Sequence, residues 1–238
     1  MPPTEEVFRQ DAYARACVAR VTAVDEAGVR LDRTVFYPLG GGQPGDTGEL
    51  VLEDGTAIRI VDTRKGETPG EIVHAPQGPV DPGLVGAMVT ARIDWDRRHR
   101  LMRMHTCLHL LCSLVAAPVT GGSVRDGSGR LDFDLPESTL DKQDLTERLN
   151  RLVAEDHTVT PRWISEEELD ANPSLVRTMS VTPPRGQGRV RVLDIEGVDL
   201  QPCGGTHVAS SSEIGRVRVT KIEKKGRQNR RVTVALDH

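Results

Sequence analysis

The chain has 238 residues and a formal net charge of −4, with 31 basic and 35 acidic side chains. A chain of this length can bury a full core and suggests two domains. The slightly acidic balance excludes a global attraction to nucleic acid, so any such binding must come from local basic patches.

Neither the start of the chain nor its apolar runs predict secretion or membrane insertion. The first residues, MPPTEEVFRQDAY, contain acidic side chains and no apolar core, unlike a signal peptide. The longest mostly apolar run, 107–119, is interrupted by His109 and Ser113 and is too short to span a bilayer. The four cysteines are typical of intracellular thiols rather than of a disulfide framework. We therefore expect a soluble, cytoplasmic protein that has no contact with a membrane.

The first part of the chain has the pattern of short β-strands. Residues 16–25 alternate polar and apolar side chains, and a second run at 29–37 follows a turn. Further short runs, separated by Gly, Pro and Asp clusters, lie at 49–52, 57–62, 71–74 and 88–93. This spacing is typical of a sandwich or a barrel, and we expect the domain to end near Ile93.

A glycine-rich segment inside this β region, 36–48, reads FYPLGGGQPGDTG. Its three successive glycines permit positive φ and let another backbone or a phosphate approach closely. A bend fixed by the flanking prolines is the simpler interpretation. The segment lacks the Gly-Lys-Ser/Thr ending of a P-loop, so we expect no nucleotide cofactor.

The stretch from 94 to 118 predicts the central helix of the protein. Apolar residues recur at helical spacing at Leu101, Met104, Leu108, Leu111 and Val115. This pattern predicts an amphipathic helix over about 96–116, capped by Asp94 or Asp96 and stopped by Pro118.

Two pairs of metal-binding side chains share one spacing. His105 and His109 stand four residues apart, so both imidazoles point off the same face of the helix. Much later, in QPCGGTH, Cys203 and His207 repeat the spacing. Two helical imidazoles with a thiolate and an imidazole from a glycine turn make a tetrahedral zinc set. Cys112, on the same helical stripe, could replace Cys203, and ordinary histidines with a buried cysteine are the alternative without metal.

The second part of the chain mixes helices and strands. A strand with one wet face is expected at 130–135 and a helix with an apolar stripe at 141–156. A capping box at Ser165 opens a short helix. Further strands are expected at 189–195, 214–222 and 231–236. Helices on one face of a mainly antiparallel sheet make this an α+β protein.

Two basic clusters could meet a phosphate backbone. Arg97, Arg98 and Arg100 lie in the first turn of the central helix, where an external anion would offset their conflict with the helix dipole. Pairing with Asp94 and Asp96 is the alternative. The second cluster, with a net charge of +6 from residue 216 onward, contains Arg216, Arg218, Lys221, Lys224, Lys225, Arg227, Arg230 and Arg231 against Glu223 and Asp237. A solvated hairpin is its alternative interpretation.

Four motifs resemble freestanding alanyl-tRNA editing proteins of the AlaX type. This family is related to the editing region of alanyl-tRNA synthetase and, more distantly, of threonyl-tRNA synthetase. The motifs are FYPLGGGQPGDTG (36–48), IDWDRR (93–98), MRMHTCLHLL (102–111) and PCGGTHV (202–208), in order over nearly the whole chain. The resemblance implies a small β-barrel domain at 1–93 and an α/β two-layer editing domain with a mainly antiparallel sheet at 94–238.

The resemblance also implies an activity. It implies Zn²⁺ at His105, His109, Cys203 and His207, and ATP-independent hydrolysis in trans of mischarged tRNA(Ala), chiefly Ser-tRNA(Ala). Four protein ligands would close a tetrahedral shell, whereas catalytic zinc keeps a position open, so we expect a three-ligand or expandable site. The alternatives are a structural-zinc module that binds tRNA without hydrolysis, and a deacylase for glycine or threonine.

Recognition of the amino acid departs from the family pattern. Many alanyl-tRNA synthetases have a functional Gln before a Gly-Ser pair, whereas the corresponding stretch here is VTGGS (119–123). Serine adds one hydroxyl to alanine, which a small synthetase pocket cannot strongly reject, so a second site must bind that hydroxyl. Thr120, Ser123 and Thr206 are the candidates, although each could bond the local backbone instead.

Contacts with the tRNA are expected from both basic clusters and from the glycine segment, whose Gly-Gly-Gln resembles the tripeptide with which release factors hydrolyse peptidyl-tRNA. The candidates are Arg97, Arg98, Arg100, Lys221, Lys224, Lys225, Arg227, Gly41, Gly42 and Gln43.

Overall fold

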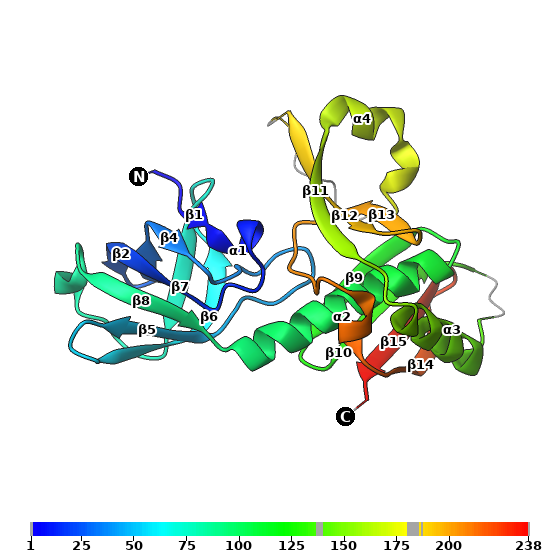
Figure 1. Cartoon of the computed structure of the whole chain (residues 1–238), viewed down its shortest axis with the longest axis horizontal. Coiled ribbons are helices and arrows are strands. Elements are labelled where there is room, and N and C mark those ends of the chain that lie inside the picture. Colours follow the sequence, from blue (N-terminus) through cyan, green and yellow to red (C-terminus); the bar gives the residue numbers. More distant parts are fainter. Residues whose placement is uncertain (1, 137–139, 180–185, 187, 238) are drawn as a thin grey trace. The chain divides into compact units, whose positions relative to one another are not determined.

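The computed structural model of the chain describes residues 2–136, 140–179, 186 and 188–237. It contains two compact units, Met1–His99 and Arg100–His238. The long helix α2 (Trp95–Leu114) begins in the first unit and continues into the second (Figure 1). Asp94 caps this helix, because its carboxylate accepts a hydrogen bond from the backbone N–H of Arg97 at 3.2 Å.

The first unit is built around a closed antiparallel barrel in the order β2-β3-β7-β6-β5-β8. Its strands are β2 (Ala16–Asp25), β3 (Gly28–Leu31), β5 (Gly48–Leu52), β6 (Ala57–Lys65), β7 (Ile72–Pro76) and β8 (Met88–Ile93). Two short strands, β1 (Glu5–Glu6) and β4 (Arg33–Thr34), pair in parallel beside helix α1 (Val7–Gln10), and a 3₁₀ turn, η1, spans Pro82–Leu84. The predicted small β-barrel is confirmed.

Alternation along the strands places aliphatic side chains inside the barrel. In β8, for example, Val89, Ala91 and Ile93 are buried, whereas Arg92 faces out. The strand expected at 29–37 is interrupted at Asp32, whose carboxylate accepts a hydrogen bond from the backbone N–H of Arg20 at 2.8 Å. This side-chain bond replaces a ladder bond, so the single predicted strand becomes β3 and β4.

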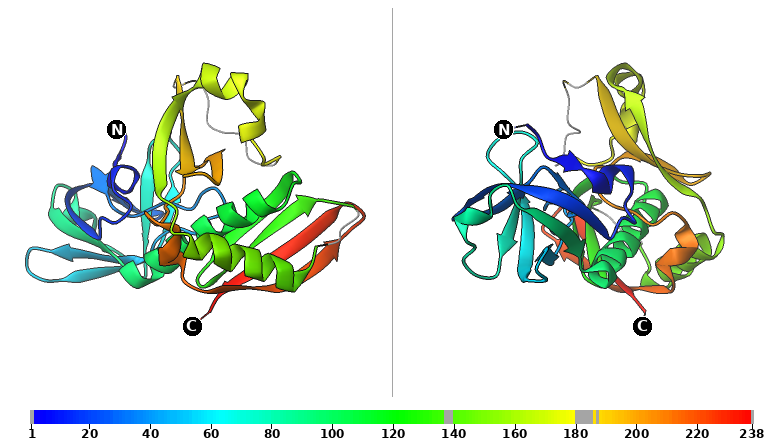
Figure 2. Two further views of the ribbon diagram at one scale, coloured as in Figure 1. Left: turned by 45° about the vertical axis from the view of Figure 1, so that its right-hand side comes forward. Right: turned by 60° about the vertical axis from the view of Figure 1, so that its left-hand side comes forward.

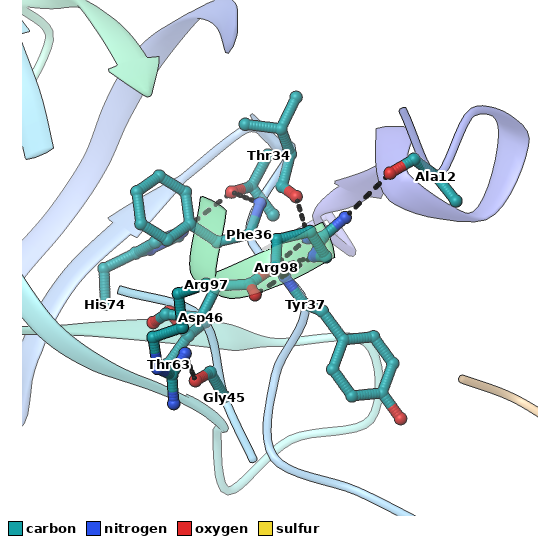
Figure 3. A network of polar contacts seen from close by, with 11 residues as sticks. Ala12, Thr34, Phe36, Tyr37, Gly45, Asp46, Thr63, His74, Arg97 and Arg98 are labelled. Atoms are coloured by element: carbon teal, nitrogen blue, oxygen red, sulfur yellow. Dashed lines mark hydrogen bonds and ion pairs between the residues drawn. The ribbon is translucent and has the colours of Figure 1, made fainter. Parts of the chain in front are cut away.

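His74 is fully buried in the first unit, and its ring forms a T-shaped contact with that of Phe36. Its Nδ1 lies 3.0 Å from the carbonyl oxygen of Val29. Its Nε2 lies 2.8 Å from the hydroxyl of Thr34 (Figure 3). The carbonyl can only accept, so Nδ1 carries the proton and Nε2 accepts from Thr34. Burial lowers the pKa of His74 from 6.5 to about 4.

Because the unfolded chain binds a proton near pH 6.5 and the folded chain only near pH 4, His74 should destabilise the fold as the pH falls through this window. We expect the free energy of unfolding to lose about 3 kcal/mol through this residue, with no further loss below pH 4. Urea unfolding of the wild type and of His74→Gln at several pH values measures the effect. The same pH dependence in both proteins would contradict it.

The second unit combines α2 with two antiparallel sheets (Figures 1 and 2). The four-stranded sheet has the order β14-β15-β10-β9 and consists of β9 (Val119–Arg125), β10 (Ser128–Asp134), β14 (Val217–Lys225) and β15 (Asn229–Leu236). Helix α3 (Lys142–Ala154) packs on β14, where the amide of Asn150 bonds both the N–H and the carbonyl of Val217. The helices and mainly antiparallel sheets confirm the predicted α+β class.

The three-stranded sheet has the order β11-β12-β13 and consists of β11 (Val159–Ser165), β12 (Arg189–Ile195) and β13 (Asp199–Pro202). Helix α4 (Glu166–Ala171) covers one of its faces, and two 3₁₀ turns, η2 (Pro173–Leu175) and η3 (Ser211–Ile214), complete the unit. None of the helices in the described parts of the chain combines the length and apolarity needed to cross a membrane.

A glycine sets how closely α2 approaches the four-stranded sheet. A Cβ at Gly129 of β10 would lie 2.9 Å from the Met104 sulfur and 3.1 Å from a Leu108 methyl. Any larger residue at this position would push away the helix that carries His105 and His109.

Candidate metal centre

His105 and His109 project from α2 toward the loop that follows β13. Both side chains are buried, and their rings lie 5.4 Å apart, as one helical turn requires. The His207 ring approaches that of His105 to 4.3 Å and that of His109 to 5.0 Å. Three imidazoles from two distant segments therefore share one small volume.

Arg191 on β12 shapes the loop that supplies Cys203 and His207. Its guanidinium donates to the carbonyl oxygens of Cys203 (2.7 Å) and Gly205 (3.0 Å). The backbone N–H of Cys203 in turn donates to the carbonyl of Arg191 at 3.1 Å. The backbone bond between β12 and Cys203 therefore fixes the position of Cys203. The hydrogen bonds of the buried Arg191 side chain fix the turn that follows Cys203.

The four side chains fit a metal ion. The Cys203 Sγ lies 3.1 Å from Nε2 of His207 and 3.6 Å from Nε2 of His105. One ligand atom from each of the four residues lies within 4.8 Å of all the others. Tetrahedral zinc bonded to nitrogen and sulfur places its ligand atoms about 3.3–3.8 Å apart, so small side-chain shifts would complete such a site. Cys112, the rival ligand in the sequence, is buried outside this group.

The electrostatics of the cluster keep its imidazoles neutral. Burial, followed by the neighbouring imidazoles, holds the pKa of His105 and of His207 well below 6.5. Burial, then the charges of Arg191 and Arg177, lowers the pKa of His109 to about 4. A neutral imidazole is the form that binds a metal, so the site presents its histidines in that form at neutral pH.

Thr106, next to His105 on α2, fixes the orientation of His207. Its hydroxyl donates to the carbonyl of Met102 at 3.0 Å and accepts from the N–H of Val208 at 3.3 Å. The same oxygen lies 3.2 Å from Nδ1 of His207. Because the single hydroxyl proton is already donated, His207 must donate from Nδ1, which leaves the lone pair of Nε2 directed at the cluster.

Replacing Thr106 by valine should therefore lower zinc affinity about 10- to 100-fold, whereas serine, which retains the hydroxyl, should preserve it. Competition with a chromophoric chelator measures both variants. Equal zinc affinity in Thr106→Val and the wild type would rule out the orienting role of this hydroxyl.

The candidate residues for serine recognition occupy different environments. Thr206 is buried in the loop between the two ligands Cys203 and His207. The hydroxyl of Thr120 bonds locally, 3.1 Å from the carbonyl oxygen of Asp132 and 3.2 Å from Oδ1 of Asn229. Ser123 is half-buried on β9. The local bonding expected as an alternative is therefore present at Thr120.

Arg98 does not have the role predicted for it. Its side chain is fully buried, and it forms an ion pair with the buried carboxylate of Asp46 in the glycine segment (Figure 3). The guanidinium also donates to the carbonyl oxygens of Ala12 (3.1 Å) and Val35 (2.7 Å). The predicted tRNA contact of Arg98 and its alternative pairing with Asp94 or Asp96 are both wrong, because its cation is neutralised by Asp46.

The glycine segment is held from both sides. Asp46 accepts from the N–H of Tyr37 at 2.6 Å, and Arg97 donates to the carbonyl of Gly45 at 2.9 Å (Figure 3). Gly41 and Gly42 have positive φ, which glycine permits, and both are exposed. Gln43 is fully buried, so this structure contradicts a direct contact of its side chain with tRNA.

The other basic candidates lie at the surface. Arg100 pairs with Asp126. On the β14–β15 hairpin, Lys221 and Lys225 both pair with Glu223, at 2.8 and 3.4 Å, and Lys224 and Arg227 are exposed. Exposed pairs of this kind contribute little to stability.

Comparisons with known proteins agree with the architecture. Residues 190–233 match the family described as "Threonyl and Alanyl tRNA synthetase second additional domain", and residues 7–97 match "tRNA synthetases class II (A)". The chain is 36% identical to the alanyl-tRNA editing protein AlaX-M of Methanosarcina mazei, over 98% of its own length and 96% of that relative. The chain belongs to the AlaX family of alanyl-tRNA editing proteins.

Other relatives show the same relationship. The AlaX-M protein of Methanosarcina barkeri is 38% identical over 98% of the chain and 99% of that relative. An alanine–tRNA ligase of Pyrobaculum neutrophilum is 35% identical over 94% of the chain, but the match covers only 26% of the ligase. The AlaX relatives therefore match along their whole length, and the resemblance carried by the four motifs is confirmed.

Proposed function

We propose that this AlaX-family chain is an aminoacyl-tRNA deacylase that acts in trans on mischarged tRNA(Ala), chiefly Ser-tRNA(Ala), and that residues 94–238 form its editing domain. The observation that carries the proposal is the cluster of three buried, neutral imidazoles and one thiol in the family's own motifs. The names of its relatives, which are alanyl-tRNA editing proteins, support the substrate class.

His105, His109, Cys203 and His207 would hold a zinc ion, which supplies Lewis acidity toward the carbonyl of the aminoacyl ester when it is bound. Thr106 and Arg191 orient two of these ligands. Cys203 is the most exposed of the four, so the ester would approach from its side. Four protein ligands would close a tetrahedral shell, so the ester could reach the ion only if one of these residues yielded or the coordination expanded.

Selection against correctly charged tRNA requires a polar group that bonds the serine hydroxyl. Ala-tRNA(Ala) would leave such a group unpaired and would therefore bind less well. Thr206 supports this role best because it lies in the loop between two ligands, and Thr120 and Ser123 stay as further candidates.

The remaining surface candidates are proposed to meet the tRNA backbone. They are Arg97, Arg100, Lys221, Lys224, Lys225, Arg227, Gly41 and Gly42. Exposed Lys and Arg side chains of this kind suit the regularly charged backbone of a nucleic acid.

The test is a deacylation assay with purified zinc-loaded protein and four substrates: Ser-tRNA(Ala), Gly-tRNA(Ala), Ala-tRNA(Ala) and Ser-tRNA(Ser). We expect rapid ester loss from the first and little from the last two. Hydrolysis of none would support the structural-zinc module, because a shell with four protein ligands is typical of structural sites. Faster hydrolysis of Gly-tRNA(Ala) would show that glycine, not serine, is the preferred amino acid. Equal hydrolysis of Ser-tRNA(Ala) and Ser-tRNA(Ser) would show that the protein does not select tRNA(Ala).

A further inference from the structure

Trp163 is an exposed aromatic side chain on the edge strand β11. About half of it (48%) is accessible to solvent, although tryptophan is usually well buried. The guanidinium carbon of Arg189, on the neighbouring strand β12, lies 4.8 Å from the centre of its ring. This is a cation–π contact, which holds the indole in place and adds a positive charge beside it.

The register of the sheet places Trp163 on the face that carries the metal-binding loop. Trp163 pairs with Arg191, and the carbonyl of Arg191 accepts the backbone N–H of Cys203. Directly paired residues project to the same face, and neighbouring strands are about 4.8 Å apart, so the Cα atoms of Trp163 and Cys203 are about 10 Å apart. The indole therefore lies two strands away from a proposed metal ligand.

The opposite face of this sheet carries the apolar cluster that packs against α4. Ile164, Val190 and Val192 point to that face and are buried with Leu169 of α4. Figure 1 shows α4 on the side of the sheet that faces away from α2. Trp163 alternates with Ile164 along β11, so it is excluded from this core and projects toward the side of the metal cluster.

The charges around Trp163 favour an anionic ligand. Arg189 and Arg191 share its face at this end of the sheet, whereas Arg162 and Asp194 point to the other face and pair with each other at 3.2 Å. An exposed indole flanked by guanidinium groups combines a stacking surface with an attraction for phosphate.

We propose that Trp163, held by Arg189, stacks on a base of the unpaired 3′ end of the tRNA while the ester lies at the metal cluster. This inference rests on the proposed function. The ester is attached to the terminal ribose, so a tRNA whose ester lies at the metal cluster has its 3′-terminal bases close to the cluster. Stacking on an aromatic ring tolerates any base, so the contact supplies affinity for the 3′ end without selecting the amino acid.

Kinetics separate stacking from a structural role. Trp163→Leu should raise KM for Ser-tRNA(Ala) about 5- to 150-fold, the range for one stacked base, with little change in kcat because the indole does not touch the ester. Trp163→Phe retains an aromatic ring and should recover most of the lost affinity. An unchanged KM in an active Trp163→Leu variant would overturn the inference, as would equal losses in the leucine and phenylalanine variants.

Fluorescence tests the contact without any hydrolysis. The chain has two tryptophans, so the Trp95→Phe variant leaves Trp163 as the single emitter. Uncharged tRNA(Ala) should quench it saturably, and the same tRNA without its 3′-terminal CCA should not. If the protein hydrolyses Ser-tRNA(Ala) but both tRNAs give equal emission, the stacking inference alone fails. Quenching that depends on the 3′ end, in a protein that does not hydrolyse Ser-tRNA(Ala), would support the stacking site and contradict the deacylase proposal.

Discussion

Cys203→Ala should lower the rate of Ser-tRNA(Ala) hydrolysis at least ~100-fold and leave tRNA binding largely intact. Loss of a residue that only orients a ligand costs about 10- to 100-fold in metal affinity or activity, so loss of a ligand itself should cost more. Cys203 is the single sulfur in the cluster, within 3.1 and 3.6 Å of two imidazole nitrogens. Deacylation rates, zinc content by elemental analysis and tRNA affinity by filter binding measure the three consequences.

Cys112→Ala is the matched control, because Cys112 lies on α2, the helix that carries His105 and His109, but outside the cluster. It should retain both zinc and activity. A Cys203→Ala protein that hydrolysed Ser-tRNA(Ala) at the wild-type rate with zinc bound would show that the proposed site is wrong. Loss of zinc in Cys112→Ala, with retention in Cys203→Ala, would instead favour the helical cysteine as the ligand.

Arg98→Met should destabilise the first unit by about 3–5 kcal/mol, because it leaves the buried carboxylate of Asp46 without its cation. This loss of stability arises from desolvation, because both side chains have almost no contact with water. Removal of one leaves the other charge buried without a partner. In an Arg98→Met/Asp46→Leu protein neither charge is present, and we expect much of the loss to be recovered.

Urea unfolding followed by the fluorescence of Trp95, in a Trp163→Phe background, measures this effect in the first unit. Trp95 is a suitable reporter because its ring contacts Tyr13 and Arg15 in the same unit. Single and double variants together form a double-mutant cycle. A loss below about 1 kcal/mol for Arg98→Met, the range of an exposed pair, would contradict the structural role assigned to the buried pair.

Local patterns in the sequence predicted the central helix and many of the strands, but not β9, β11 and β13. Apolar spacing placed α2 within two residues of its ends, and the short run expected at 88–93 matches the bounds of β8. These signals are local, because a helix or a strand must place one face toward the core. The interruption at Asp32 was not predictable in the same way, because it depends on a bond to Arg20 on another strand.

The candidate site was predictable where residue type alone limits the chemistry. A His–His pair and a Cys–His pair with equal spacing indicated a metal site, but spacing left both Cys112 and Cys203 as ligands, and the pairing of β12 with β13 brings Cys203 to the cluster. The tRNA contact predicted for Arg98 was wrong because sequence spacing cannot show that a charge is buried. Its partner Asp46 lies 52 residues away in the sequence. The orienting role of Thr106 was also missed, because it depends on the hydrogen bonds of one hydroxyl.

X-ray absorption spectroscopy of the zinc-loaded protein tests the central claim most directly, because it identifies the atoms bound to the metal. We predict one sulfur at about 2.3 Å and nitrogen from imidazoles at about 2.0–2.1 Å, with loss of the sulfur in Cys203→Ala. A shell without sulfur in the wild-type protein, or one that keeps its sulfur in Cys203→Ala, would contradict the joining of the two motifs around one zinc ion.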